Sequence, residues 1–190
     1  MEVTETPLAR FDAAFRRHHA RVLAYALRRA PSESDAEDAV AETFAAAWRR
    51  VDRLPDPDVA LPWLLAIARR VLANQRRGAA RRWRLDQRLR GQPRDPDQTH
   101  TAQTPALEAL ARLRPDDQEL LRLLAWDALS QAEAGVVLGI SANAVAIRLH
   151  RARRRFADEL HSVKGSGASR TSDQVESRMP GHRSHEEHAP

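Results

Sequence analysis

The sequence contains no cysteine, which excludes disulfide bonds, a cysteine nucleophile and cysteine-ligated zinc. Aromatic residues make up only 5% of its 190 residues, glycine occurs seven times, and isoleucine occurs at three positions. Because aromatic and β-branched residues favour strands, their scarcity predicts a core of leucine, alanine and valine built from helices.

Long hydrophobic runs are also missing. No apolar stretch approaches the roughly 18 residues that a membrane span requires, and the first residues lack the apolar segment of a signal peptide. We therefore expect a soluble, cytoplasmic protein.

The sequence has no constellation typical of catalysis: no Walker glycine loop, nucleophile elbow or HExxH motif occurs. We therefore expect no enzymatic activity, no cofactor and no metal. His182, His185 and His188 recur every three residues, but they lie in a polar tail without a second ligand group, which favours solvated side chains. His18 and His19 have no partner pattern, and we expect them on the surface.

Lysine is nearly absent, with Lys164 the single example, and the basic residues are otherwise arginine. The formal net charge of +5 and the calculated pI near 10.9 favour nucleic acid or an acidic surface as a partner. A preference for arginine can also arise from a GC-rich genome, so arginine content alone does not decide between these explanations.

Two segments without apolar periodicity divide the chain. Residues 91–105 contain three prolines and predict a linker, and residues 162–190 are polar and predict a disordered tail. Residues 1–90 and 106–161 remain as domains. The predicted fold class is therefore all-α, with two small helical domains joined by a flexible linker.

The stretch "GVVLGISANAVAIRLHRARRRF" predicts a helix-turn-helix in the second domain. Ser130 and Glu133 form a capping-box pattern, so a helix begins near Gln131. Gly139 suits the left-handed residue after that helix, and Ser141 can cap the next one. A glycine at position 135 permits the close approach that such a corner needs.

The second helix of this motif has an apolar and a basic side. Its apolar stripe consists of Val145, Leu149, Ala152 and Phe156. Asn143 and Ile147 lie opposite as candidate base readers, and the later arginines are candidate phosphate contacts. The alternative is a basic helix that only faces solvent.

The third predicted helix of the first domain is strongly basic, because residues 69–90 contain nine arginines and one acid, Asp86. Opposite its apolar stripe lie Arg69, Arg70, Arg76 and Arg77. A continuous cationic face of this kind is typical of phosphate binding, although a solvated surface has the same pattern. We expect Trp63 to pack in the core rather than to stack on DNA. For Trp83, packing in the protein and contact with nucleic acid are equally consistent with the sequence.

Residues 31–48 are acidic, with five carboxylates and no basic residue. Ser34 with Glu37 predicts the start of this helix. The helix dipole explains acids in the first turn, including Asp35, but Glu42 lies too far along. Since Asp35, Asp38 and Glu42 align away from the apolar stripe, the pattern predicts a basic protein partner.

The segments "SDAEDAVAETFAAAWRRVDRL", "LPWLLAIARRVLANQRRGAARR" and "LARLRPDDQELLRLLAWDALSQAEAGVVLGISANAVAIRLHRAR" resemble bacterial extracytoplasmic-function sigma factors over about residues 8–160. The resemblance implies that the N-terminal domain binds the clamp helices of the RNA polymerase β′ subunit and recognises the −10 promoter element. It implies that the C-terminal domain binds the −35 element and the β flap. Members of this family are commonly held inactive by an anti-sigma factor.

The resemblance also assigns individual residues. Asp35, Asp38 and Glu42 match the polymerase-binding helix. The loop from Val51 to Leu61, which contains Asp56 and Asp58, matches the segment that captures a flipped −10 base. The helix along the −10 DNA is matched by Arg69, Arg70, Asn74, Arg76 and Arg77. The −35 recognition helix is matched by Asn143, Ala144, Ile147, Arg148, Arg151 and Arg154.

Two positions depart from the family pattern. Asn74 lies four residues after Arg70, where the family often has arginine followed directly by asparagine. The recognition helix has Ala-Val-Ala-Ile from Ala144 to Ile147, where the family often has Thr-Val-Lys-Ser. The missing lysine weakens one DNA contact that the resemblance implies, whereas Ile147 can touch a thymine methyl group.

The predicted function is that of a sigma factor that binds core RNA polymerase and directs initiation at specific promoters. A stand-alone helix-turn-helix regulator that binds operator DNA is the main alternative. An adaptor that binds polymerase without reading DNA is a second. The regulator leaves the acidic helix and the second arginine face unexplained, and alanine at Asn143 and Arg148 tests the adaptor.

Overall fold

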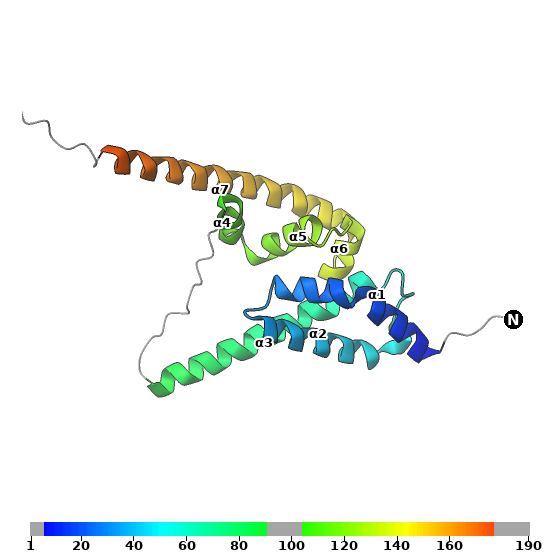
Figure 1. Ribbon diagram of the computed structural model, residues 1–190. Coiled ribbons are helices and arrows are strands. Elements are labelled where there is room, and N and C mark those ends of the chain that lie inside the picture. Colours follow the sequence, from blue (N-terminus) through cyan, green and yellow to red (C-terminus); the bar gives the residue numbers. More distant parts are fainter. Residues whose placement is uncertain (1–5, 91–103, 177–190) are drawn as a thin grey trace, which may run out of the picture.

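The computed structural model describes residues 6–90 and 104–176, with side chains described for 6–84 and 104–165. Throughout these ranges the regular structure is helical (Figure 1), so the predicted all-α class is confirmed. The N-terminal half contains α1 (Pro7–Leu27), α2 (Glu33–Trp48), the short 3-10 helix η1 (Val51–Arg53) and α3 (Leu61–Arg90). The C-terminal half contains α4 (Pro105–Arg112), α5 (Pro115–Ala125), α6 (Gln131–Leu138) and α7 (Ala142–Glu176).

Local sequence signals set the starts of these helices. Thr6 caps α1 by accepting a hydrogen bond from the Ala9 amide, and Pro7 follows as the first helical residue. The prediction that Ser34 begins α2 is wrong. Ser32 is the cap, and its hydroxyl accepts a hydrogen bond from the Asp35 amide at 3.1 Å. Both serines precede an acid by three residues, so the pattern alone did not distinguish them.

The core of the N-terminal half forms where α1, α2 and α3 pack together. It includes Val22, Ala26, Val40, Phe44, Leu64, Ile67, Ala68 and Val71, which recur at helical spacing in the sequence. Burial of these side chains positions α2 and α3 so that their polar faces point outward.

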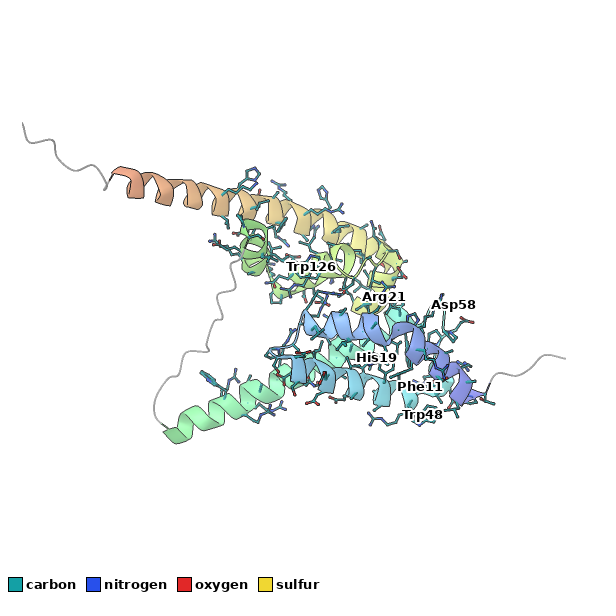
Figure 2. The ribbon with its side chains drawn as sticks, in the orientation of Figure 1. Phe11, His19, Arg21, Trp48, Asp58 and Trp126 are labelled. Carbon is teal, nitrogen blue, oxygen red and sulfur yellow. The ribbon has the colours of Figure 1, made fainter. Side chains whose placement is uncertain are left out.

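Three more apolar residues at the same helical spacing are exposed instead: Leu8 by 64%, Phe15 by 38% and Trp48 by 44%. Near one end of the helices no described segment covers the stripes completely, and the aromatic rings pack on one another. Phe11 lies edge-on to Trp48 with ring centroids 5.1 Å apart (Figure 2). Phe15 packs on Phe44 at 4.7 Å.

In the C-terminal half, α6 and α7 form the predicted helix-turn-helix, with their axes at 98°. Ser130 and Glu133 make both hydrogen bonds of the capping box, and the Ser130 backbone amide lowers the pKa of the Glu133 carboxyl. Gly139 has a φ of +70°, and Ser141 caps α7 by accepting from the Ala144 amide. On α7, the expected apolar residues Val145, Leu149 and Ala152 are buried, and Phe156 is half-buried.

Helix α7 continues to Glu176, well into the segment expected to be disordered from Ser162. Part of the reason is packing, because α4 lies against α7 and Val163 is buried. Residues 177–190, with the three spaced histidines, and residues 91–103 of the expected linker lie outside the described residues.

The two halves contact each other, which the sequence did not predict. Helix α6 packs on α3, and one continuous apolar cluster includes Leu64 and Leu72 from the N-terminal half and Leu120, Leu123 and Val137 from the C-terminal half. Over the described ranges no single helix is both long and apolar enough to cross a membrane; α6 and the first part of α7 reach the required hydropathy only as a bent pair.

The close contact at Gly135 gives a test of the corner geometry. A β-carbon at this position would lie 2.7 Å from the backbone oxygen of Ile140, so Gly135→Ala must displace the turn. We expect it to lower the free energy of unfolding by about 1–3 kcal/mol in urea denaturation. The control, Gly165→Ala in α7, has no atom within 4 Å of the added carbon and should be neutral or slightly stabilising. Equal effects of the two substitutions would contradict the close approach.

Candidate nucleic-acid and polymerase interface

Helix α7 presents its predicted DNA-reading side to solvent. Asn143, Arg148, Arg151 and Arg154 are exposed, Ile147 is 48% exposed, and Ala144 is partly covered. This surface therefore combines the amide of Asn143, the apolar side chain of Ile147 and three guanidinium groups. Such a combination can contact base edges and phosphates in a major groove.

Another arginine of the same basic run has a structural role. Arg155 pairs with Asp117 at 2.6 Å, and Asp117 is nearly buried in the first turn of α5. This ion pair ties α7 to α5. Beside it, Arg148 and Arg151 of α7 line a groove together with Arg114, Asp116 and Asp117 at the start of α5.

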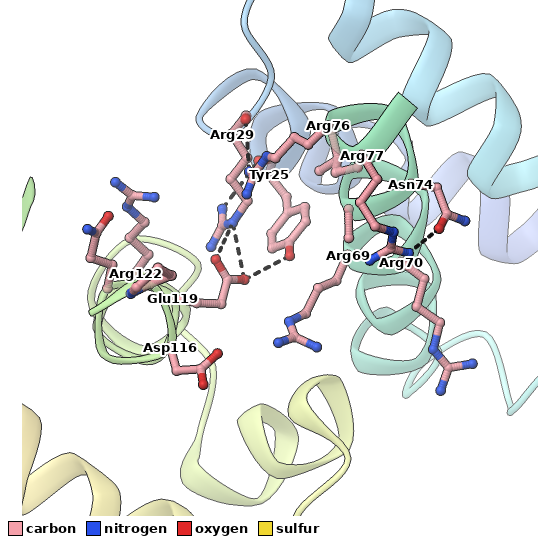
Figure 3. Close-up of a pocket in the computed structure, with 14 residues that line it drawn as sticks. Tyr25, Arg29, Arg69, Arg70, Asn74, Arg76, Arg77, Asp116, Glu119 and Arg122 are labelled. Atoms are coloured by element: carbon pink, nitrogen blue, oxygen red, sulfur yellow. Dashed lines mark hydrogen bonds and ion pairs between the residues drawn. The ribbon is translucent and has the colours of Figure 1, made fainter. Parts of the chain in front are cut away.

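Helix α3 places its predicted arginines on a common side (Figure 3). Arg70, Arg76 and Arg77 are exposed and Arg69 is half-buried. Arg77 donates a hydrogen bond to the amide oxygen of Asn74. Since this acceptor is neutral, the arginine face of α3 keeps its full positive charge for phosphate groups.

The acidic residues Asp35, Asp38 and Glu42 are all exposed on α2. They line a groove between α2 and α3, and Arg76 and Arg82 contribute to its opposite wall. Asp35 also accepts a hydrogen bond from the Ser32 hydroxyl at 2.6 Å, so its first function is at the helix start. Asp38 and Glu42 have no basic partner among the described residues.

The loop between η1 and α3 is fixed to α1. The carboxylate of Asp56 accepts from the Asp58 amide at 2.8 Å, which shapes the turn. Asp58 projects outward and pairs with Arg17 at 3.0 Å (Figure 2). His18, expected on the surface, is instead buried, and its Nε2 lies 2.6 Å from the backbone oxygen of Pro57. The expectation was wrong because this loop covers the ring.

A cluster of buried charge connects the two halves (Figure 3). The side chain of Arg29, in the turn that follows α1, is only 2% exposed and pairs with Glu119 at 2.9 Å and with Asp127 at 2.8 Å. The Tyr25 hydroxyl donates to Glu119 at 2.8 Å, and the Arg29 guanidinium stacks 3.7 Å above the Tyr25 ring. Arg28 also pairs with Asp127, and Arg21 donates to its backbone oxygen at 2.8 Å.

The electrostatic effects within this cluster are large. Burial raises the pKa of Tyr25 far above its usual range, and the Glu119 carboxylate raises it further. Burial alone would lower the pKa of Arg29, but Glu119, Tyr25 and Asp127 together outweigh this effect and hold the pKa above its usual value. Both groups therefore keep their ordinary protonation states, neutral phenol and charged guanidinium, throughout the physiological range.

Sequence reasoning missed His18, Tyr25 and Arg29. Arg29 occurs within "RRAPSES" and Tyr25 is the single tyrosine, and neither position has a pattern that predicts contact with residues about 90 positions away. Trp63 packs against the core, as expected, and Trp83 is 52% exposed.

The fold and its surfaces define a class: an all-helical, two-part DNA-binding protein with a helix-turn-helix and a separate acidic surface. A family model described as "Sigma-70 region 2" matches residues 14–82, and one described as "Sigma-70, region 4" matches residues 104–156. The chain belongs to the extracytoplasmic-function family of RNA polymerase sigma factors. It therefore binds core RNA polymerase and promoter DNA and directs transcription initiation, and the comparisons give no support to a stand-alone regulator.

Several relatives cover most of the chain. The RNA polymerase sigma factor NccH of Alcaligenes xylosoxydans xylosoxydans is 32% identical over 155 residues, which are 76% of this chain and 83% of NccH. CarQ of Myxococcus xanthus is 30% identical and covers 81% of this chain and 91% of its own length. SigL of Mycobacterium tuberculosis is 31% identical, with coverage of 75% and 84%.

Solved structures agree with the fold. CnrH, in complex with the cytosolic domain of CnrY, superposes with a TM-score of 0.55 at 28% identity, over 80% of this chain and 88% of that one. RpoE of Bartonella quintana, in complex with the anti-sigma factor NepR, has a TM-score of 0.58 at 23% identity, over 80% and 96%.

The buried cation predicts a strong effect of removing it. Arg29→Met leaves Glu119 and Asp127 partly uncompensated, and we expect the free energy of unfolding to fall by about 3–5 kcal/mol in urea titrations. Arg16→Met, which removes an exposed i,i+4 pair with Asp12, should cost less than about 0.5 kcal/mol. A triple variant that also carries Glu119→Gln and Asp127→Asn should recover part of the loss. Wild-type stability of Arg29→Met would contradict the coupling.

Proposed function

We propose that this sigma factor divides its work among three surfaces: the acidic stripe of α2 for polymerase, α3 with the loop before it for the −10 element, and α7 for the −35 element. The observation that carries this assignment is the separation of charge. Asp38 and Glu42 are exposed on one helix and have no basic partner among the described residues, while exposed arginines occupy α3 and α7.

The acidic stripe of Asp35, Asp38 and Glu42 cannot bind DNA, because carboxylates repel phosphates. Exposed carboxylates without basic partners instead favour a basic protein surface, which we infer to be the clamp helices of the β′ subunit. Asp35 contributes less than the other two, since it is already hydrogen-bonded to Ser32.

For the −10 element, we infer that Arg69, Arg70, Arg76 and Arg77 contact the phosphate backbone and that Asn74 contributes a neutral hydrogen bond. The loop of residues 51–61 would receive the flipped base. Asp56 shapes this loop through the Asp58 amide, and the exposed Asp58 is the better candidate to meet the base. Capture of an unstacked base offsets the few kcal/mol that extrusion costs, so melting needs no nucleotide hydrolysis.

For the −35 element, Asn143 and Ile147 are placed to read base edges in the major groove, with Ala144 close to the DNA. Arg148, Arg151 and Arg154 are placed to bind phosphates. The C-terminal half would also contact the β flap.

Sigma factors are not enzymes in general, and we infer that this chain acts without catalysis, cofactor or metal. We infer that it works in the cytoplasm, beside polymerase. The residues 1–90 and 106–161 would act as the two promoter-binding units, joined through 91–105. The similar proteins RpoE and CnrH were solved with NepR, an anti-sigma factor, and with CnrY. By analogy, we infer that an anti-sigma factor also restrains this chain.

Charge reversal tests the polymerase surface. Asp38→Arg combined with Glu42→Arg should weaken binding to core RNA polymerase by about 100-fold or more, because like charges then face each other. Binding is measured by size-exclusion co-elution and by fluorescence titration. Glu37→Arg is the matched control, since Glu37 is exposed on α2 but points away from the stripe. Unchanged affinity in the double variant, with intact circular dichroism, would refute the assignment.

Alanine substitutions test the recognition helix. Asn143→Ala and Arg148→Ala should each weaken specific promoter binding by the holoenzyme roughly 10- to 100-fold, while polymerase binding stays constant. The measurement is fluorescence anisotropy with promoter DNA selected by the wild-type holoenzyme. Lys164→Ala, near the far end of the described part of α7, controls for the loss of one positive charge. An adaptor that does not read DNA would lose nothing in any of these variants.

A further inference from the structure

A cavity of about 510 Å³ lies where α1, α3 and α5 meet, between the two halves of the chain (Figure 3). Six arginines line it, against the two carboxylates Asp116 and Glu119. The arginines are Arg29, Arg69, Arg70, Arg76, Arg77 and Arg122. Its volume is within the roughly 300–1,000 Å³ typical of small-molecule sites, and it is far too small to admit a DNA duplex.

Most of this positive charge is not neutralised within the described residues. Glu119 is already used by Arg29 and Tyr25. Arg76 donates to the backbone oxygen of Arg29 at 3.0 Å, which is a neutral acceptor. Neither Arg69 nor Arg122 pairs with a carboxylate of the described chain.

Arg122 gives an independent indication of an anion site. Its Nε is buried and has no hydrogen-bond partner among the described residues. Burial lowers the pKa of Arg122, and the neighbouring Arg29 and Arg76 lower it further, although Glu119 opposes this effect. A partly buried guanidinium among other cations is unfavourable, and a bound anion is the simplest source of compensation.

We propose that this cavity binds a polyphosphate anion whose linked phosphates contact Arg122 of α5 together with Arg69 and Arg76 of α3. Arg69 projects from α3 toward α5, so cations approach the space from both halves (Figure 3). A guanidinium group often donates two parallel hydrogen bonds to one phosphate group. Several arginines on different helices therefore suit a chain of linked phosphates better than a single phosphate.

The bound anion has two consequences. It bridges α5 and α3, so it stabilises the packing of the C-terminal half on the N-terminal half. It also occupies Arg69 and Arg76, which belong to the proposed −10 surface; this second consequence rests on the proposed function. A polyphosphate would then hold the factor in a form that competes with promoter DNA.

The first experiment is isothermal titration of the full-length protein with inorganic tripolyphosphate at fixed ionic strength. We expect one saturable site. Arg122→Gln and Arg69→Gln should each bind roughly 10- to 100-fold more weakly, because each removes one charge-assisted contact. Arg16→Gln removes the same charge from an exposed side chain of α1 outside the cavity, and its affinity should stay within about twofold of wild type. Orthophosphate should bind at least about tenfold more weakly than tripolyphosphate.

Several outcomes would overturn the site: no saturable binding by the wild type, equal affinity in Arg122→Gln, or an equal loss in Arg16→Gln, which would indicate diffuse attraction. Thermal unfolding checks that the variants fold. If Arg69→Gln does not fold, the affinity of Arg122→Gln tests the site by itself. Titration with GTP distinguishes the source: tighter binding than tripolyphosphate indicates a nucleoside polyphosphate, and equal or weaker binding indicates inorganic polyphosphate. Because Arg122 lies outside the proposed promoter contacts, Arg122→Gln should keep promoter binding, so a failed anion site leaves the proposed function standing.

Discussion

The arrangement of the two halves depends on one buried cation, Arg29. A guanidinium that is 2% exposed needs carboxylates close by, and the chain supplies Glu119 and Asp127 from the other half. Those two acids belong to α5 and to the turn before α6, so satisfying Arg29 fixes where both segments sit against α1. The apolar contact of α6 with α3 follows from the same placement.

The same constraint explains how the cationic surfaces are distributed. With α5 held against α1, the arginine face of α3 turns partly toward the other half, and the cavity forms between them. The exposed side of α7 is left open, because Val145, Leu149 and Ala152 anchor its opposite side. The acidic stripe of α2 lies on another groove, next to Arg76 and Arg82. The packing of α5 against α1 therefore determines which charged side chains face solvent and which face each other.

Much of the fold could be predicted from the sequence, because short-range chemistry determines it. Gly135, Gly139 and the Ser130–Glu133 pair each have a local steric or hydrogen-bonding reason, and the structure confirms all of them. One local prediction failed, because Ser32 and Ser34 have the same spacing to an acid; the other failures occurred where the answer depended on distant residues. His18 is covered by a loop some 39 positions away, and Arg29 meets acids that are 90 and 98 positions away. The exposure of Trp48 was equally invisible, because a stripe on one helix does not show how far its neighbours extend. The roles of the exposed site residues remain proposals, since exposure alone does not identify a partner.

The chemistry of the contact between the halves bears on how a two-part factor can work. If apolar surface alone joined them, separation would cost free energy for all the area exposed. Charges behave differently: a buried ion pair gains little net stability over hydrated partners, because desolvation offsets most of the attraction. When the halves separate, Arg29, Glu119 and Asp127 regain water, so the cluster contributes specificity of docking more than strength. Removing one partner, in contrast, strongly destabilises the docked form. The remaining charges are then buried without compensation when the halves are docked, whereas they are hydrated when the halves are apart. The cluster therefore suits a contact that forms in one geometry and can still open, as the proposed use of separate surfaces for the −10 and −35 elements requires.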